Sequence, residues 1–511
     1  MKRFLTIISL LVWLAVICTT SCVHKPQGVV APLADGNYPA AVAKIIINKC
    51  TYSGCHNQAS YQNAAGLLLD TWEHMFNGSV TGAEVIAYST KFSPLLYYCN
   101  VDSSRGVVSK DPGHLDTPLS HDEYMTLYNW IAAGAPDKNG NVPFASNPAT
   151  RQKIYITSQG CDLLIVIDAK SRVVMRYIPI GMSTTQIESP HDVEISGDGM
   201  YAYVPLFNGN YVQKIDTRTD TVVGNVNVAA VTSGGTGGGW SIISLSPGDT
   251  TLLVSGWMAN GYVVAVRTGG MIVSDPLSID RYSGGTTDFP YPHGLASNAT
   301  FDTFFATLQY GNVVNKYTFN GGYHKKYVSV NGQPAIVTNP SDAANPNPHQ
   351  IEMSPDNSRY FVTCQSTNEV RVMDAHADTV IAAIPVGTFP QEMDLSLSKH
   401  YLFIACMEDA ANPQPGRHGS VYVIDYNTYA VVKILYGDFY QPHDVTVDEQ
   451  DGLVFIPSRN ANPNGPAPHH SSACGGRDGW YSVYDLNTLL PADNNRYEVT
   501  VDPYASAARF H

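Results

Sequence analysis

The stretch RYFVTCQSTNEVRVMDAHADTVIAAIPVG, residues 359–387, contains three short runs in which apolar and polar residues alternate. Alternation with a period of two is typical of β-strands that are buried on one face. A polar segment separates the first two runs, and an Asp-containing turn precedes the third. The stretch therefore predicts three consecutive strands joined by tight turns.

The same pattern occurs seven times after residue 151. The other copies are residues 153–181, 200–228, 250–273, 301–328, 400–437 and 452–491. A period of about fifty residues built from short strands indicates a β-propeller. We therefore predict a mainly β protein with a seven-bladed propeller over residues 151–511. The last segment, VTVDPYASAARFH (499–511), is expected to supply the inner strand of the first blade and close the ring.

These copies resemble the Tyr-Val-Thr-Asn type of repeat, which is found in exported seven-bladed propellers. The resemblance implies the fold of this part of the chain. It leaves the function open, because a fold hosts many functions.

The turns that lead into the seven innermost strands share one position. Four of them place His directly after Pro, and the other three place Trp, Gln or Tyr there. In chain order the seven residues are His191, Trp240, His293, His349, Gln391, His443 and Tyr504. Long hairpins on the same face carry His418, His469, His470 and Cys474. We therefore predict up to seven histidines and one thiol at a single channel mouth.

Imidazole clusters with few acidic neighbours suit copper, zinc or iron better than calcium or magnesium. The arrangement is similar in kind to the propeller of nitrous oxide reductase, and copper-dependent propeller oxidases offer a second likeness. These likenesses imply copper or another transition metal in the propeller, and the candidate ligands are His191, His293, His349, His443, His469 and His470. The alternative is a metal-free channel in which the histidines bond neighbouring blades. Asp192 and Asp444 either orient an imidazole or cap backbone amides.

A second motif, INKCTYSGCHNQ (47–58), contains Cys, four residues, then Cys-His. In a haem attachment site two thiols add to the haem vinyl groups and the adjacent His ligates iron. The usual spacer is two residues, so this one is longer. Zinc would need further ligands at defined spacing. A disulfide beside a surface histidine is the other alternative.

Two amphipathic segments flank this motif. YPAAVAKIIINKC (38–50) has an apolar face at helical spacing, and LSHDEYMTLYNWIAAGAPD (119–137) begins with a capping box of Ser120 and Glu123. Gly134 and Pro136 are expected to end the second helix. We predict that residues 40–137 are mostly helical.

The stretch CTYSGCHNQASYQNAAGLLLDTWEHMFNGS (50–79), together with the closing helix, resembles the cytochrome c-like haem-binding domains of exported bacterial proteins. The resemblance implies a small α-helical domain with covalent haem c on Cys50 and Cys55 and with His56 as the proximal ligand. Such domains often place Met before the last helix. The corresponding loop here, KDPGHLDTPLS (110–120), has no Met, so we expect His114 to be the distal ligand. An open, five-coordinate haem is the alternative.

The chain opens with MKRFLTIISLLVWLAVICTTSC (1–22), in which two basic residues precede an apolar run. This pattern indicates an export signal. We predict a lipoprotein signal peptide over residues 1–21, acylation of Cys22, and a tether over residues 22–39. An ordinary signal peptide or an uncleaved anchor is the alternative. The protein is then exported and lipid-anchored to a bacterial membrane, facing the periplasm or the cell surface.

Nine cysteines are present, and Cys18 and Cys22 lie within the signal segment. The seven that remain are an odd number without paired spacing, which does not predict a disulfide scaffold. The formal net charge of −14, without a basic block, argues against nucleic acid as a partner. Residues 138–150 are rich in Pro, Gly and Asn and are expected to form a linker.

The sequence thus predicts a membrane-tethered c-type cytochrome joined to a propeller and acting in electron transfer. Its partner is a redox protein or a small-molecule substrate, and an enzymatic activity would be that of an oxidoreductase. The alternative is a non-enzymatic binding or scaffold propeller whose haem domain only relays electrons, or whose Cys50–Cys55 pair is a disulfide.

Overall fold

The computed structural model describes residues 35–106, 108–110, 114, 117–229, 238–259, 261–273, 290–319, 323–342, 344–459, 474 and 479–510. The predicted signal peptide, Cys22, His469 and His470 lie outside the described residues. Within these ranges, no helix is both long and apolar enough to cross a membrane.

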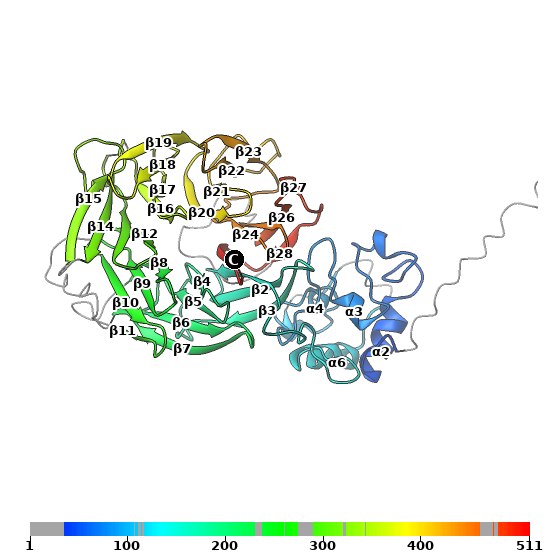
Figure 1. Ribbon diagram of the computed structural model, residues 1–511. Coiled ribbons are helices and arrows are strands. Elements are labelled where there is room, and N and C mark those ends of the chain that lie inside the picture. The colour runs from blue at the N-terminus through cyan, green and yellow to red at the C-terminus, as the bar shows by residue number, and fades with distance from the viewer. Residues whose placement is uncertain are drawn as a thin grey trace, which may run out of the picture.

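The described strands form seven antiparallel sheets arranged around a central axis, which is the predicted β-propeller (Figure 1). Blade one comprises β29 (Pro503–Ala508), β1 (Lys153–Ser158), β2 (Leu163–Asp168) and β3 (Val173–Pro179). Blade two comprises β4 (Glu194–Ile195), β5 (Tyr201–Pro205), β6 (Tyr211–Asp216) and β7 (Thr221–Asn227). Blade three comprises β8 (Trp240–Leu245), β9 (Thr251–Gly256), β10 (Tyr262–Arg267) and β11 (Ile272–Val273).

The remaining four blades repeat this order from the axis outward. They comprise β12 (Pro292–Ser297), β13 (Thr303–Leu308), β14 (Val313–Phe319) and β15 (Tyr323–Ser329); β16 (Pro348–Met353), β17 (Arg359–Cys364), β18 (Glu369–Asp374) and β19 (Val380–Pro385); β20 (Pro390–Ser396), β21 (Tyr401–Cys406), β22 (Ser420–Asp425) and β23 (Val431–Leu435); β24 (Thr446–Asp448), β25 (Leu453–Ser458), β26 (Gly479–Asp485), β27 (Leu490–Pro491) and β28 (Tyr497–Val499).

The C-terminal strand closes the ring, as the sequence predicts. β29 pairs antiparallel with β1, with Ala508 opposite Ile154 and Ala507 opposite Tyr155. The first blade is therefore built from both ends of the propeller segment. This closure removes the exposed sheet edges that an open array would leave between its first and last units.

The sheets pack face to face, so their inner strands are buried on both sides. All residues of β1 and β2 are buried, whereas β7 near the rim exposes every second residue from Thr221 to Asn225. A strand covered on both faces requires a nearly continuous apolar run. Strands nearer the rim keep the alternating pattern by which the blades were recognised.

Carboxylates at the start of the inner strands tie neighbouring blades together. Asp192 Oδ2 accepts a hydrogen bond from Ile243 N (2.9 Å), and Asp444 Oδ2 accepts one from Ser506 N (2.6 Å). Each carboxylate also accepts the amide of the residue that follows it. The sequence predicts that Asp192 and Asp444 either orient an imidazole or cap backbone amides. In the structure both cap backbone amides.

The N-terminal region contains short helices joined by loops. They are α2 (Ala40–Ile45), the π-helical turn η1 (Ile46–Cys50), the 3₁₀ turn η2 (Tyr61–Asn63), α3 (Trp72–Met75), α4 (Pro94–Tyr98), the 3₁₀ turn η3 (Ser103–Arg105) and α6 (His121–Ala132). The prediction of a mostly helical region is wrong in extent, because loops make up most of residues 51–120 and wrap around a cavity. The predicted capping box of Ser120 and Glu123 is confirmed.

This region packs directly on blades one and seven (Figure 1). Ile86 is buried in one apolar cluster with Val173 of β3 and Tyr497 of β28. The predicted linker takes part in the contact, because Phe144 packs against the core of the N-terminal region and against two propeller clusters. Arg496 N and Glu498 N also donate hydrogen bonds to Val80 O and Thr81 O, each at 2.9 Å. Residues 138–150 therefore join two packed bodies.

A disulfide links Cys161 of the first blade to Cys474 in the seventh. The prediction of a thiol at the channel mouth from Cys474 is wrong, because Cys474 is bonded to Cys161. The partners are 313 residues apart, so local spacing could not reveal the pair. Cys364 and Cys406 are free and fully buried.

The contact between Asp444 and Ser506 generates a stability prediction. Ser506→Pro removes the amide that donates to Asp444 and leaves a buried oxygen unsatisfied, so we expect the free energy of unfolding to fall by about 3 kcal/mol or more. Ser506→Ala keeps this amide and loses only side-chain hydrogen bonds, including the one from Thr446 Oγ1, which should cost about 1 kcal/mol. Urea unfolding followed by tryptophan fluorescence measures both. Equal losses in the two variants would contradict the role given to the amide.

Candidate functional sites

The first candidate site is a cavity of about 500 Å³ in the N-terminal region. Its wall includes all four residues that the sequence assigns to a haem: Cys50, Cys55, His56 and His114. The remaining wall is largely apolar and includes Leu67, Leu69, Leu95, Val101 and Leu119. A mainly apolar cavity with a few converging polar groups is the usual form of a small-molecule or cofactor site.

The orientation of His56 is fixed by its backbone neighbour. Its Nδ1 lies 3.1 Å from Leu67 O. A carbonyl oxygen can only accept, so Nδ1 carries the proton and Nε2 keeps its lone pair for a metal. Burial lowers the pKa of His56, and the nearby His114 lowers it further, although the hydrogen bond to Leu67 acts in the opposite direction. The imidazole is therefore held neutral, which is the state that binds a metal.

His114 approaches His56 from a distant part of the chain. The two ring centroids are 6.3 Å apart, and the ring planes differ by 16°. Two imidazoles bound to opposite sides of one metal ion, each through a bond of about 2.0 Å, have centroids roughly 6 Å apart. The pair is therefore spaced for a single metal ion between the rings.

The four-residue spacer between the cysteines forms a tight loop. Cys55 N donates to Tyr52 O (3.1 Å), and His56 N donates back to Cys50 O (3.0 Å). The loop follows η1, and π-helical turns are frequent at functional sites. Cys50 and Cys55 are separate thiols, and burial raises the pKa of Cys50 so that its thiol stays protonated.

The second candidate site lies at the propeller axis. The seven residues that the sequence predicts at these turns are at most 2% exposed. The four Pro-His residues gather there with Tyr504: ring centroids are 3.8 Å apart for His293–His349, 5.6 Å for His191–His293, 6.0 Å for His349–His443 and 3.6 Å for His443–Tyr504. The structure thus brings together the histidines that the sequence singled out. His418 contacts Glu408 and Tyr440 instead.

One backbone feature turns these side chains toward the axis. The residue two positions before each inner-strand side chain, directly before the Pro in six blades, has positive φ: Ser189 (53°), Tyr291 (50°), Asn347 (56°), Phe389 (60°), Gln441 (51°) and Asp502 (62°). Positive φ is uncommon outside glycine. The third blade has Gly239 at the corresponding place, with φ of 70°, where a Cβ would lie 2.2 Å from Trp257 O. Gly239 lies two positions before Ser241, and Trp240 pairs with Gly256 as Pro292 pairs with Leu308. The prediction that Trp240 takes the channel position is therefore wrong, because Trp240 occupies the place of the Pro and packs between blades two and three. The seven turns therefore share one backbone conformation, and in four of them it precedes a histidine of the axial cluster.

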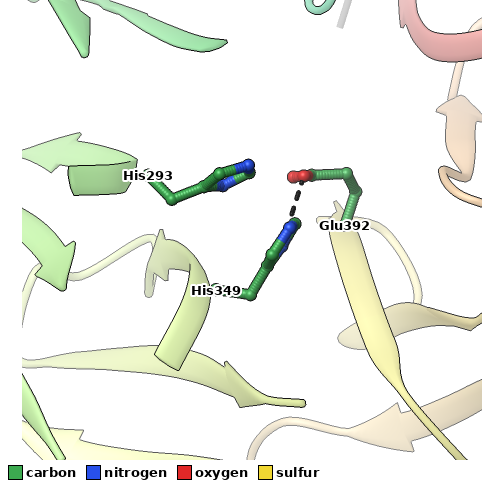
Figure 2. Close-up of side chains that lie close together, drawn as sticks. All are labelled: His293, His349 and Glu392. Carbon is green, nitrogen blue, oxygen red and sulfur yellow. Dashed lines mark ion pairs between the residues drawn. The ribbon is translucent and has the colours of Figure 1, made fainter. Parts of the chain in front are cut away.

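Glu392 joins two of these histidines. Its Oε1 lies 3.6 Å from His349 Nδ1, and one potential ligand atom from each of His293, His349 and Glu392 lies within 4.8 Å of the others. Figure 2 shows the three side chains pointing toward one another. Sequence reasoning missed Glu392 because it considered only the preceding position, Gln391. The available signal was the acid that follows this position in three blades.

The axis is rich in buried carboxyl groups. Burial raises the pKa of Asp192 to about 6, although two backbone amides oppose the shift. Burial, reinforced by the charges of Asp444 and Asp192, raises the pKa of Glu392 well above its usual range. Burial likewise raises the pKa of Asp444 well above its usual range. Negative charge is therefore costly here unless a cation is close.

A second layer of side chains lies next to the histidines. The ring centroids of His191 and Phe207 are 5.1 Å apart, and those of Phe207 and Trp257 are 6.2 Å apart. Gln365 donates to Gln391 (3.1 Å). The buried ion pair of Arg459 and Asp502 lies against Tyr504, because the Arg459 guanidinium carbon is 5.3 Å from that ring centroid. The channel thus has aromatic and polar walls beside the imidazoles.

No protein-family model matches the chain, and no curated protein matches it. Two solved structures are similar in overall fold. A functionally unknown protein from Desulfotomaculum acetoxidans is 12% identical, with a TM-score of 0.47 over 69% of this chain and 99% of that one. A protein from Bacteroides uniformis, assigned provisionally as a 6-phosphogluconolactonase, is 12% identical, with a TM-score of 0.48 over 70% of this chain and all of that one.

The raised pKa of Asp192 generates a pH prediction. Because this pKa rises from 3.8 to about 6 on folding, the folded state binds more protons than the unfolded state in that window. The stability that this group contributes at low pH is therefore lost as the pH rises from about 4 to 6, by up to about 3 kcal/mol. Thermal unfolding at pH 4.5 and pH 7.5 should show a larger decrease for the wild type than for Asp192→Asn. The exposed control Asp122→Asn should follow the wild type, and parallel curves for all three proteins would contradict the prediction.

Proposed function

We propose that residues 40–137 bind one haem c through thioether bonds to Cys50 and Cys55, with His56 and His114 as axial ligands. The protein then acts as a c-type cytochrome in electron transfer. The observation that carries this proposal is the shared cavity, because side chains from residues 50–56 and from residue 114 line the same space. Its volume of about 500 Å³ lies within the usual range for cofactor sites, about 300–1,000 Å³.

The two competing interpretations of the Cys-His motif fit this geometry less well. A structural zinc ion needs four ligands around a small centre, whereas these residues line a large and mainly apolar cavity. A disulfide needs Cys50 bonded to Cys55, whereas both are free thiols. The disulfide of the chain lies elsewhere, between Cys161 and Cys474.

Haem c, when bound, supplies reversible one-electron transfer. The protein residues set the conditions for it. Leu67 O holds the proton of His56 on Nδ1 and so leaves the lone pair of Nε2 available. His114 lines the same cavity, and the largely apolar walls limit water around the site. A second imidazole in place of Met would give a bound haem a lower potential, since the ligands of the iron are a main determinant.

The contact with the propeller gives the cavity a short connection to blade seven. Thr81 lines the cavity, and its carbonyl accepts the hydrogen bond from Glu498 N in β28. One residue therefore borders both the proposed cofactor and the propeller. We take this wall as the side on which the propeller contributes to electron exchange, either with a bound partner or with its own site.

The Cys161–Cys474 disulfide supports the proposed location of the protein. Stable disulfides are typical of exported proteins and are rare in the cytosol. Attachment to a membrane through Cys22 stays part of the proposal, because residues 1–34 lie outside the described part of the chain.

The haem proposal is tested on the exported protein by absorption spectroscopy and mass spectrometry. We expect a c-type spectrum of a low-spin, six-coordinate iron, and a peptide containing Cys50–Cys55 that carries the mass of haem. His114→Ala should keep the covalent haem and lose the six-coordinate, low-spin signature. His121→Ala is the matched control, since this histidine is 63% exposed at the start of α6, and should leave the spectrum unchanged.

Two results would contradict the assignment. A Cys50–Cys55 peptide without added mass, from protein matured in a strain that makes c-type cytochromes, would end the haem proposal. An unchanged spectrum in His114→Ala would keep the haem and remove His114 as its ligand.

A further inference from the structure

We propose that His293, His349 and Glu392 bind a divalent first-row transition-metal ion at the axis of the propeller. This site is separate from the cavity of the N-terminal region, and the inference does not depend on the haem. The three ligands come from the starts of the inner strands β12, β16 and β20, which belong to three consecutive blades.

The ligand atoms already lie close to the spacing that one ion requires. Metal bonds of about 2.0–2.1 Å place neighbouring ligand atoms about 3 to 3.5 Å apart. His349 Nδ1 and Glu392 Oε1 are 3.6 Å apart, and the three atoms all lie within 4.8 Å of one another. These separations exceed those of a bound ion only slightly, and rotation of the Glu392 side chain can bring its carboxylate closer to the two imidazoles.

The type of ligand selects the class of metal. Two imidazole nitrogens and one carboxylate oxygen suit zinc, iron, manganese or copper, whereas calcium and magnesium prefer oxygen ligands throughout. Three protein ligands leave coordination positions open. Open positions distinguish sites that bind a substrate or an activated water from closed structural sites. The set therefore matches a reactive metal centre.

The carboxylate of Glu392 has a different environment from those of Asp192 and Asp444, which follow the channel position in their own blades. Asp192 and Asp444 use both oxygens to cap backbone amides. Glu392 occupies the same position of its blade, but its Oε1 accepts no hydrogen bond from any described residue. A buried carboxylate oxygen without a donor is costly, and metal coordination is one of the few ways to compensate it. The longer side chain of Glu392 carries this oxygen to the imidazoles.

The backbone is shaped to let His293 and His349 approach each other. Gly294 follows His293, and a Cβ at this position would lie 2.6 Å from His349 O and 2.5 Å from Gln350 Oε1. Glycine thus permits the close contact of β12 with β16 that places the two rings 3.8 Å apart. The ligand positions are fixed by main-chain geometry before any ion arrives, which favours binding.

The test uses the full-length protein and measures metal content by elemental analysis. Haem is quantified separately so that its iron can be subtracted. We expect about one further zinc, iron, manganese or copper ion per chain, and the element found identifies the metal. The near-isosteric Glu392→Gln and the variant His349→Gln should each weaken Zn²⁺ binding to chelator-treated protein by about 100-fold or more.

His443→Gln is the matched control. This histidine occupies the equivalent position of the seventh blade, is equally buried and adjoins the same cluster, but it does not belong to the three-residue set. It should retain the ion. Circular dichroism verifies that each variant is folded. As a second measurement, Zn²⁺ should raise the melting temperature of the wild type and of His443→Gln, but not that of Glu392→Gln.

Three outcomes would overturn the inference. One is a folded wild-type protein that contains no metal beyond haem iron and binds neither Zn²⁺ nor Co²⁺. Another is retention of full affinity in Glu392→Gln. The last is loss of the ion in His443→Gln with retention in His349→Gln, which would place the metal elsewhere in the histidine cluster.

Discussion

The closure of the ring by β29 is the constraint on which the rest of the structure depends. β29 pairs with β1, and its Ser506 amide bonds to Asp444 of the neighbouring blade. Without this strand the first blade would have no inner edge, and the axis would be open on one side. Because the ring is closed, seven turns of like conformation converge, and a residue repeated along the sequence becomes a cluster in space. The histidine site is thus a consequence of symmetry.

Residues that differ between the blades at the axis determine which ligands the axis can bind. In two blades the residue after the channel position is an aspartate, Asp192 or Asp444, and it caps an amide of the next blade, which is a structural role. Replacing it by Glu392 adds one methylene and carries the carboxylate to His349. Replacing it by Gly294 removes a side chain and lets two histidines approach. Different residues at one repeated position therefore create an asymmetric site on a symmetric scaffold.

The propeller could be predicted from sequence because its signals are local. Strand alternation and the Pro-His turns each act over a few residues, and the same holds for the capping box of Ser120 and Glu123 in the N-terminal region. The disulfide of Cys161 with Cys474, and Phe144 as a contact between the two parts, could not be predicted, because they depend on long-range packing. Glu392 could be predicted only in part. Its position was visible in the sequence, but the direction of its side chain depends on the neighbouring blades.

The packing of the N-terminal region also bears on how the two sites relate. Ile86 lies in an apolar cluster of the propeller, and Phe144 packs against clusters of both parts. The carbonyl of Thr81 accepts a hydrogen bond from β28, and Thr81 also lines the cavity. Such a buried contact resists relative motion more than a solvated linker does. If the cavity holds haem and the axis holds a metal ion, the distance between them is then set by the fold. Electron exchange between them would depend on that fixed distance and on the potentials of the two centres. A docking step would be needed only for an external partner.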